Sequence, residues 1–270
     1  MEPMEYILYL NKRLLAEMPM YRQWAATFLP DQKSQRRLLR GLMNLRPPLP
    51  LQEDFLQVQD ALLSAEREKK GVVQINELAP TRANPKIILW QGDITRLQVD
   101  AIVNAANDTL LGCFCPCHGC IDNAIHSAAG LQLRDECNHI MCSQGHRELT
   151  GQAKQTKAYN LPCQYVFHTV GPVVTGPLTQ SLRKELAACY RACLELAAKQ
   201  HLTSIAFCCI STGEFHFPPK EAAQIALTTV NTFLPKPTSL RKVIFNVFQD
   251  SDYQIYRHLL GADCPTSSTY

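Results

Sequence analysis

The chain has 270 residues, of which 46% are hydrophobic and 19% are charged, enough apolar material for one core plus an extension. Its net charge of +3 is weak, so nucleic-acid binding, which usually needs a much more basic domain, is not expected. No apolar run approaches the ~20 residues of a membrane span, and the first residues lack the pattern of a secretory signal. The twelve cysteines are therefore expected to be thiols or metal ligands in a cytoplasmic protein without membrane contact.

Residues 1–75 are predicted to form a helical N-terminal extension. Apolar residues recur at helical spacing over 6–15, 34–45 and 53–69. Pro19, Pro30 and the Arg-Pro-Pro-Leu-Pro segment at 46–50 separate these stretches. The basic stretch 33–46 is interpreted as a solvated helix face, with a docking surface for an acidic partner as the less favoured alternative.

From residue 86 onward, short apolar runs of strand type alternate with helical patterns. Strands are predicted over 87–90, 99–103, 153–159, 165–170, 204–209 and 242–247, and helices over 124–137, 178–200, 220–233 and 252–260. This alternation predicts an α/β fold, a three-layer α/β/α domain around a mostly parallel sheet. We assign it to residues 76–265, leaving 266–270 as a C-terminal tail.

Polar side chains follow two of the predicted strands, where α/β proteins build ligand sites. Asp93, in the Gly-Asp-Ile-Thr segment at 92–95, could accept hydrogen bonds from an exocyclic amine such as that of adenine, or it could only cap a turn. Asn104 and Asn107 end the next strand, where amides need hydrogen-bond partners. Asn107 could bond the vicinal hydroxyls of a sugar, or it could be satisfied by loop backbone.

The segment Cys113-Phe-Cys-Pro-Cys-His-Gly-Cys120 holds four cysteines and one histidine. Thiolates and imidazole are ligands of zinc, so the segment predicts a metal site. All candidate ligands share one loop, and three of them would leave a coordination position open, as in catalytic zinc sites. Composition alone does not say which three of the five bind. The remaining cysteines lack chelating spacing and are expected to be structural: Cys137, Cys142, Cys163, Cys189, Cys193, Cys208, Cys209 and Cys264.

Two further segments carry candidate ligand contacts. Asp122 stands where a helix begins; it could be only an N-cap, but the free N–H groups there also suit phosphate or a hydroxyl-rich ligand. His126, one turn on, is interpreted as an ordinary partly buried histidine. In the Ile-Ser-Thr-Gly-Glu-Phe segment at 210–215, small residues after a strand would let N–H groups approach a diphosphate, and Phe215 could stack on a sugar or base. A plain loop is the alternative.

Taken in order, these segments resemble the macrodomain family. The matching motifs are Gly-Asp-Ile-Thr at 92–95, Val-Asp-Ala-Ile-Val-Asn-Ala-Ala-Asn at 99–107, Ala-Ile-His-Ser-Ala-Ala-Gly at 124–130, Thr-Gly-Gln-Ala at 150–153, His-Thr-Val-Gly-Pro at 168–172 and Ile-Ser-Thr-Gly at 210–213. The likeness is to the zinc-containing macrodomains in particular, whose Cys-x-x-x-x-His-x-Cys loop is matched by Cys113, His118 and Cys120. It extends to the helical N-terminal region, so it covers most of the chain.

The resemblance implies a macrodomain fold with a mixed, mostly parallel sheet, a bound Zn²⁺ ion, an ADP-ribose pocket and removal of ADP-ribose from modified protein. Carried over by position, Asp93 and Ile94 would hold the adenine side, and Asn107 would contact the distal ribose. Ile121 and Asp122 would lie beside the zinc and the distal ribose. The residues that would cradle the diphosphate are Ser211, Thr212, Gly213, Glu214 and Phe215.

Two residues depart from the family's diphosphate loop. The Glu214 carboxylate would repel phosphates unless it points outward. His216 stands where the family usually has glycine and lacks glycine's access to positive φ. Both departures put the shape of this loop in question.

We hypothesise a metal-assisted hydrolysis at the anomeric carbon of the distal ribose, with Asp122 and Asn107 as the catalytic residues. Two alternatives remain: a module that binds ADP-ribose around a structural zinc, and a deacetylase acting on O-acetyl-ADP-ribose. The resemblance also associates this group with a sirtuin-like ADP-ribosyltransferase and with a lipoyl-carrying glycine-cleavage H-like protein as substrate.

Overall fold

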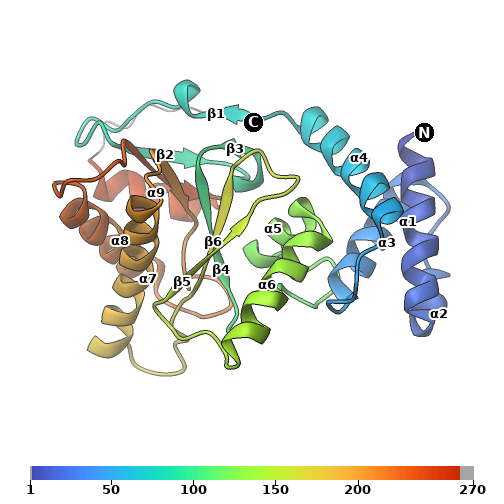
Figure 1. Ribbon diagram of the computed structural model, residues 1–270. Helices are drawn as coiled ribbons and strands as arrows, with labels where there is room; N and C mark the ends of the chain where they lie inside the picture. The colour runs from blue at the N-terminus through green and yellow to red at the C-terminus, as the bar shows by residue number, and fades with distance from the viewer. Residues whose placement is uncertain (1, 262–270) are drawn as a thin grey trace.

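The computed structural model describes residues 2–261. Cys264 and the predicted tail at 266–270 lie outside the described residues. The chain begins with α1 (Pro3–Glu17), α2 (Arg22–Ala25), α3 (Gln32–Leu45) and α4 (Glu53–Lys70). In Figure 1 these helices stand together at one end of the molecule, and α4 leads from them toward the sheet. The predicted helical extension is therefore confirmed in its secondary structure.

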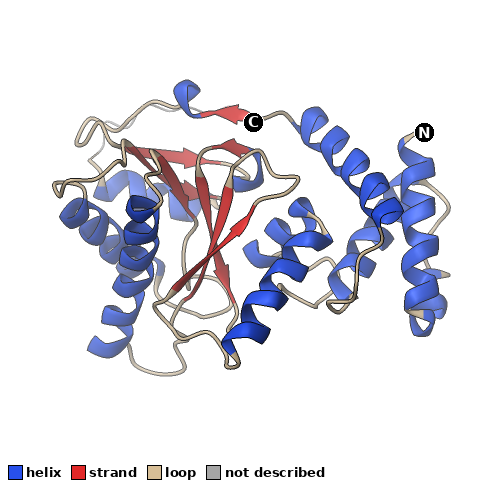
Figure 2. Ribbon diagram, in the orientation of Figure 1, coloured by secondary structure: helices blue, strands red, loops and turns tan. Residues whose placement is uncertain are grey.

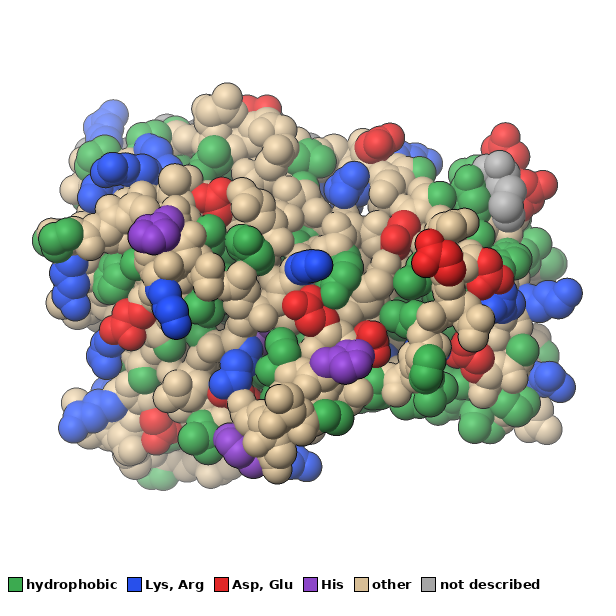
Figure 3. Space-filling view, in the orientation of Figure 1, with side chains coloured by type: hydrophobic (Ala, Val, Ile, Leu, Met, Phe, Trp, Pro, Cys, Tyr) green, Lys and Arg blue, Asp and Glu red, His purple; other side chains and the backbone are tan. Residues whose placement is uncertain are grey.

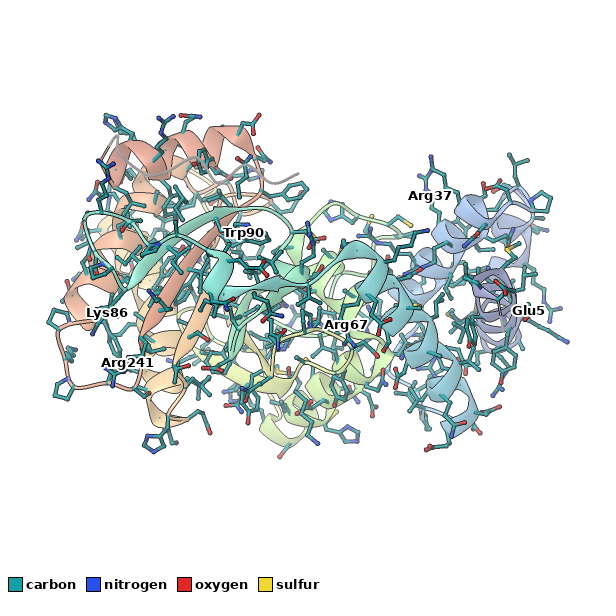
Figure 4. The ribbon with its side chains drawn as sticks, turned by 90° about the horizontal axis from the view of Figure 1, so that it is seen from above. Glu5, Arg37, Arg67, Lys86, Trp90 and Arg241 are labelled. Atoms are coloured by element: carbon teal, nitrogen blue, oxygen red, sulfur yellow. The ribbon has the colours of Figure 1, made fainter. Side chains whose placement is uncertain are left out.

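The extension has a hydrophobic cluster of its own, formed mainly by the apolar stripes of α1, α3 and α4. Leu10, Leu39 and Leu62 are among its buried members. Leu131 of the following domain also belongs to this cluster, so apolar packing joins the two parts. Polar contacts join them too: Arg67, labelled on α4 in Figure 4, donates a hydrogen bond of 2.9 Å to the carbonyl oxygen of Asn160.

The main sheet has six strands in the order β2-β8-β7-β4-β6-β5. Their bounds are β2 (Ile87–Gln91), β4 (Ala101–Ala106), β5 (Ala153–Lys157), β6 (Tyr165–Val170), β7 (Ser204–Phe207) and β8 (Lys242–Val247). All neighbouring pairs are parallel except β5 with β6, which is antiparallel. Two short strands, β1 (Val73–Gln74) and β3 (Leu97–Gln98), form a separate parallel pair. The prediction of a mixed, mostly parallel sheet is confirmed.

Helices cover both faces of this sheet, as Figure 2 shows. One layer holds α5 (Ile121–Ala129) and α6 (Leu131–Gln144), and the other holds α7 (Gln180–Lys199), α8 (Pro219–Phe233) and α9 (Asp250–Leu259). Because both faces are covered, the central strands are almost wholly buried, which explains their continuous apolar runs. The predicted three-layer α/β/α architecture is confirmed.

The single helix predicted over 124–137 is wrong, because the chain breaks at Gly130 into α5 and α6. Gly130 has a φ of +99°, a conformation that side-chain-bearing residues rarely adopt. A Cβ there would also lie 2.6 Å from the side-chain amide nitrogen of Gln59. Helical periodicity continues across the break, so it did not reveal the turn.

Two other predictions need correction, one on where a strand ends and one on the exposure of a basic stretch. The strand predicted over 99–103 runs on as β4 to Ala106, so Asn104 lies within a strand and is fully buried. The basic stretch 33–46 is not wholly a solvated face, because Arg46 is buried and its guanidinium donates to Glu17 at 2.6 Å.

The molecular surface fits the weak net charge. On the face drawn in Figure 3, acidic and basic side chains are interspersed over the extension and the α/β domain alike. Among residues 2–261, no helix combines the length and the apolar character that a bilayer crossing requires.

Candidate functional site

The carboxyl end of β4 brings three polar side chains together. Asn104 donates from its amide nitrogen to Asp122 Oδ1 at 2.8 Å and also approaches His168 Nδ1 at 3.1 Å. Asn107 donates to Asp122 Oδ2 at 3.3 Å and to the carbonyl oxygen of Gly112 at 3.0 Å. Both carboxylate oxygens of Asp122 are thus held by amides from one strand end, which fixes the orientation of that carboxylate.

The Asn107 side chain is largely engaged within its own loop. Its Oδ1 accepts from the backbone N–H of Thr109 at 3.0 Å and from the Thr109 hydroxyl at 2.5 Å. Loop contacts therefore satisfy the oxygen, and both amide hydrogens are already donated to Asp122 and Gly112, so a contact with a ligand would replace one of these bonds.

Asp122 lies in the first turn of α5 but is not its N-cap. That position belongs to Cys120, whose Sγ accepts from the backbone N–H of Asn123 at 3.4 Å. Asp122 is buried, and this burial raises the pKa of its carboxyl to about 6 in spite of the Asn104 hydrogen bond. A carboxylate held in this state can accept a proton near neutral pH.

The cysteine-rich segment, the metal loop 113–120, gathers three of its five candidate ligands. The ligand atoms of Cys113, His118 and Cys120, which we call the loop group, all lie within 4.8 Å of one another. Cys113 Sγ is 3.6 Å from His118 Nδ1. Cys115 is exposed, and Cys117 turns its Sγ toward the carbonyl oxygen of Arg37, at 3.3 Å. The structure thus brings together the three candidate ligands that the resemblance implies.

The loop group fits a zinc ion in ligand type and number. Two sulfurs and one imidazole nitrogen are a zinc set, and three protein ligands leave a fourth tetrahedral position for a further ligand. Burial raises the pKa of the Cys120 thiol to about 12, and a divalent cation would reverse this by replacing the proton. Ile121, half-buried, follows the last ligand directly and packs against the core.

The 211–216 loop follows β7 in a tightly constrained conformation. Ser211 has a φ of +66°, and its buried Oγ has no hydrogen-bond partner among the described residues. Gly171, after β6, permits this arrangement, since a Cβ there would lie 2.0 Å from Ser211 Oγ. Thr212 bonds back to the carbonyl oxygen of Cys209 at 3.1 Å, while Gly213 has open space around it. An orphaned buried hydroxyl beside an open glycine is suited to an anionic ligand.

The two departures from the family pattern take defined positions. Glu214 does not point into its own loop: its Oε1 lies 3.5 Å from His118 Nε2, which joins this loop to the metal loop. His216 adopts a φ of +56°, at a cost of roughly 1 kcal/mol for a residue with a side chain. Phe215 is partly buried against the core, and its carbonyl oxygen accepts from the N–H of Val174 at 2.9 Å.

Asp93 lies apart from this group, after β2. Its Oδ1 accepts from the N–H and hydroxyl of Thr95, at 3.0 and 2.6 Å, so it caps the short turn Ile94–Arg96. Burial alone would raise the pKa of Asp93, but hydrogen bonds from Lys70 and Thr95 outweigh it and lower that pKa. The ammonium of Lys70, at the end of α4, forms an ion pair with this carboxylate. Ile94 is fully buried.

Sequence reasoning missed two partners of the site. Lys70 closes an amphipathic helix, where a lysine is unremarkable, and only the fold brings it to Asp93. His168 lies within β6 in an apolar run, and its role as a neighbour of Asn104 comes from parallel pairing of β4 with β6. A histidine inside a buried strand was the available signal, because it must find polar partners.

The sequence is similar to known proteins over most of its length. A family model described as the Macro domain matches residues 103–226. A Protein-ADP-ribose hydrolase of Treponema medium is 48% identical over 256 residues, which cover 94% of this chain and 97% of that relative. A Protein-ADP-ribose hydrolase of Staphylococcus aureus (strain MRSA252) is 49% identical over 227 residues, or 84% and 85% of the two chains.

Solved structures agree with the fold. A Trypanosoma brucei macrodomain in complex with ADP-ribose has a TM-score of 0.64 and 34% identity, covering 82% of this chain and 95% of its own. An Oceanobacillus iheyensis macrodomain with ADP has a TM-score of 0.59 and 39% identity, covering 64% of this chain and 89% of its own.

Proposed function

Because this chain belongs to the macrodomain family, we propose that it is a hydrolase that removes mono-ADP-ribose from modified protein with the help of a zinc ion. The proposal follows the names of the Treponema and Staphylococcus relatives, which match most of the chain. The observation that carries it is local: Cys120 of the loop group lies two residues before Asp122, and Asp122 is a buried carboxylate held by two amides.

Cys113, His118 and Cys120 would hold the zinc ion. When bound, it would supply Lewis acidity beside the distal ribose. Asp122 would accept the proton of the water that attacks the anomeric carbon, since its carboxylate is held at the end of β4 by Asn104 and Asn107. The bond from that carbon to the modified side chain would break in the same reaction, and the side chain would leave with a proton. The Asn107 amide would bond a ribose hydroxyl in exchange for its 3.3 Å hydrogen bond to Asp122.

The remaining predicted residues would keep the ligand still. Asp93 and Ile94 would bound the adenine side. The diphosphate would lie along the 211–216 loop, where the Ser211 hydroxyl lacks a partner. Fixing the diphosphate holds the reacting carbon near Asp122, which lowers the entropy cost of reaching the transition state.

The proposal also names a cellular compartment and the proteins with which this chain would act. Eleven cysteines among the described residues are free thiols, which fits a reducing compartment such as the cytoplasm. The partners are an ADP-ribosylated protein, with a lipoyl-carrying glycine-cleavage H-like protein as the first candidate, and a sirtuin-like ADP-ribosyltransferase as the enzyme that attaches the group.

Release of ADP-ribose from protein substrates of defined linkage tests the function. We expect the zinc-loaded chain to free ADP-ribose, and Asp122→Asn to slow this at least 100-fold while binding ADP-ribose normally. A chain that binds ADP-ribose without releasing it would be a binding module. Faster turnover of O-acetyl-ADP-ribose than of modified protein would instead identify a deacetylase.

A further inference from the structure

Helix α3 of the N-terminal extension lies against the metal loop, although some seventy residues separate them in the chain. Arg40, on α3, donates through one guanidinium nitrogen to the carbonyl oxygen of His118 at 3.2 Å. The same side chain bonds Asn123 Oδ1 at 2.8 and 3.2 Å. One arginine therefore contacts both the backbone of a loop-group residue and the helix that follows the loop.

Asn44, one turn further along α3, forms a second set of contacts. Its Oδ1 accepts from the backbone N–H of Cys117 at 2.9 Å, and its amide donates to the Ser127 hydroxyl at 3.0 Å. Cys117 has a φ of +56°, so this hydrogen bond stabilises a backbone conformation that the loop would not favour alone. Asn44 is almost completely buried, which makes the contact costly to lose.

Asn123, which accepts from Arg40, also bonds two other residues of the metal loop. This fully buried side chain donates to the carbonyl oxygen of Cys115 at 3.0 Å, while its backbone N–H bonds Cys120 Sγ at 3.4 Å. The loop backbone is thus held at Cys115, Cys117 and His118, between the first and last ligands.

The entrance of the loop is fixed from a third helix. Arg134 of α6 donates to the carbonyl oxygen of Leu111 at 2.6 Å and to those of Met43 and Arg46, at 2.8 and 2.5 Å. Its guanidinium also lies 4.4 Å from the ring centre of Phe114. The buried guanidinium of Arg134 therefore links the carboxyl end of α3 to the segment before Cys113.

The interface is tightly packed as well as polar. Gly41 allows Trp24 and Pro116 to approach, because a Cβ at 41 would lie 2.5 Å from the Trp24 ring and 3.5 Å from Pro116. Between α3 and the helices behind the loop, a cavity of only about 10 Å³ remains, lined in part by Asn44, Ser127 and Arg134. Such a space holds at most one water molecule, so α3 packs closely against these helices.

From these contacts we propose that α3 is part of the metal site, with Arg40 and Asn44 as positioning residues that hold the metal loop in its ligand-binding shape. The inference rests on the proposed zinc-binding function. Cys113 and His118 lie in no strand or helix, and Cys120 only caps α5, so contacts from outside the loop help to determine the geometry of the three ligands. Groups that orient metal ligands without touching the metal typically change metal affinity 10–100-fold when removed.

The test compares substitutions of two arginines on the same helix. Arg36 also lies on α3, but it pairs with Glu66 within the extension, at 2.6 Å, and does not touch the metal loop. In the full-length protein, we expect Arg40→Ala to weaken zinc binding at least 10-fold, measured by competition with a chromogenic chelator, and Arg36→Ala to leave it within twofold of wild type. Asn44→Ala should resemble Arg40→Ala.

A second measurement does not depend on zinc. Hydrogen–deuterium exchange of the zinc-free protein should be faster over 113–120 in Arg40→Ala and Asn44→Ala than in Arg36→Ala. ADP-ribose affinity should stay within twofold in all three, while kcat falls in the first two. Should Arg40→Ala fail to fold, Arg40→Met, which keeps a long unbranched side chain but has no N–H donor for His118 and Asn123, takes its place.

The outcomes separate this inference from the proposed function. Equal zinc affinity and equal loop exchange in the Arg40 and Arg36 variants would overturn it. Faster loop exchange with weaker zinc binding supports it, even if the wild-type protein releases no ADP-ribose and the proposed hydrolysis is wrong.

Discussion

Among residues 2–261, two sets of cysteine and histidine side chains offer the same kinds of ligand atom, and the ligand atoms of each set lie within 4.8 Å of one another. The loop group is half-buried in a surface loop. The second, which we call the buried group, lies inside the α/β domain and consists of His126, Cys137 and His168. Thiol and imidazole are zinc ligands in both sets, so the comparison shows what a metal site needs besides suitable ligand atoms.

The imidazole hydrogen bonds distinguish them. In the buried group, His168 Nδ1 accepts from the Asn104 amide, so Nε2 carries the hydrogen and donates to Thr156 Oγ1 at 2.9 Å. No lone pair of that ring remains for a metal. In the loop group, His118 Nε2 faces Glu214 and Nδ1 faces Cys113, so a lone pair points toward the sulfurs. A carboxylate behind a histidine is the usual support of a metal ligand.

The largest expected effect is loss of zinc from the loop group. Cys113→Ser should lower zinc affinity more than 100-fold and abolish most activity, because it removes one of three ligands. Cys115→Ser, in the same loop but exposed, is the matched control and should keep one zinc per chain. Metal analysis after dialysis measures both. Equal zinc loss in the two variants would mean that the loop binds metal through a different set.

The buried group should instead affect how the free energy of unfolding depends on pH. Burial lowers the pKa of His168 to about 3, against about 6.5 in an unfolded chain, and His126 is lowered for the same reason. Below pH 6.5 the unfolded state therefore binds protons that the folded state does not, and stability is lost as pH falls toward 3. Asn104, Thr156 and Cys137 surround His168 with no acidic partner in direct contact.

We expect His168→Gln to reduce this pH dependence. Glutamine can still offer one acceptor and one donor at this position. Between pH 7 and 4.5 the variant should lose on the order of 2 kcal/mol less unfolding free energy than wild type. Urea unfolding at several pH values gives the measurement. Parallel curves for the two proteins would contradict this, because they would mean that His168 binds its proton at nearly the same pH in the folded and unfolded states.

A smaller change is expected at Cys137. The side chain is fully buried, so Cys137→Ala should cost about 1 kcal/mol of unfolding free energy by leaving a small void. Its zinc content should remain one per chain, equal to wild type. Loss of a metal ion on this substitution would contradict the distinction between the two groups.

The smallest effect should come from Glu214→Gln. The carboxylate is mostly exposed, so its support of His118 is weakened by solvent. We expect zinc affinity to fall about threefold, less than the usual range for groups behind a ligand. Glu221→Gln, which loses an ion pair between α8 and Arg183 of α7, controls for the removal of one surface charge. Indistinguishable affinities would leave His118 oriented by the metal loop alone.

Much of the fold was predictable from local patterns. The strand at 165–170 and the helix bounds of α7 and α8 follow apolar periodicity closely, because central strands and amphipathic helices leave clear signals. The break at Gly130 was missed because a lone glycine inside a helical pattern is often tolerated. Glycine is required at 130 because the Gln59 side chain lies against it. Gln59 is seventy residues away in the sequence, so the residues around Gly130 give no sign of this contact.

The candidate ligands of the site were predictable from the sequence, but the residues that hold them in place were not. Spacing and resemblance selected Cys113, His118 and Cys120, and the structure brings these three together. Arg40 and Lys70 escaped notice because each reads as an ordinary basic residue on an amphipathic helix. Their roles depend on how the extension docks onto the α/β domain, which is set by packing between distant segments.

One glycine limits how this site could be redesigned. Any substituent at position 171 would overlap the hydroxyl of Ser211, whose backbone already lies in the left-handed region. Even alanine would push that serine, and the turn it begins, away from its present path. To enlarge this binding surface or change its charge, residues 212–216 could be substituted one at a time, but position 171 must remain glycine.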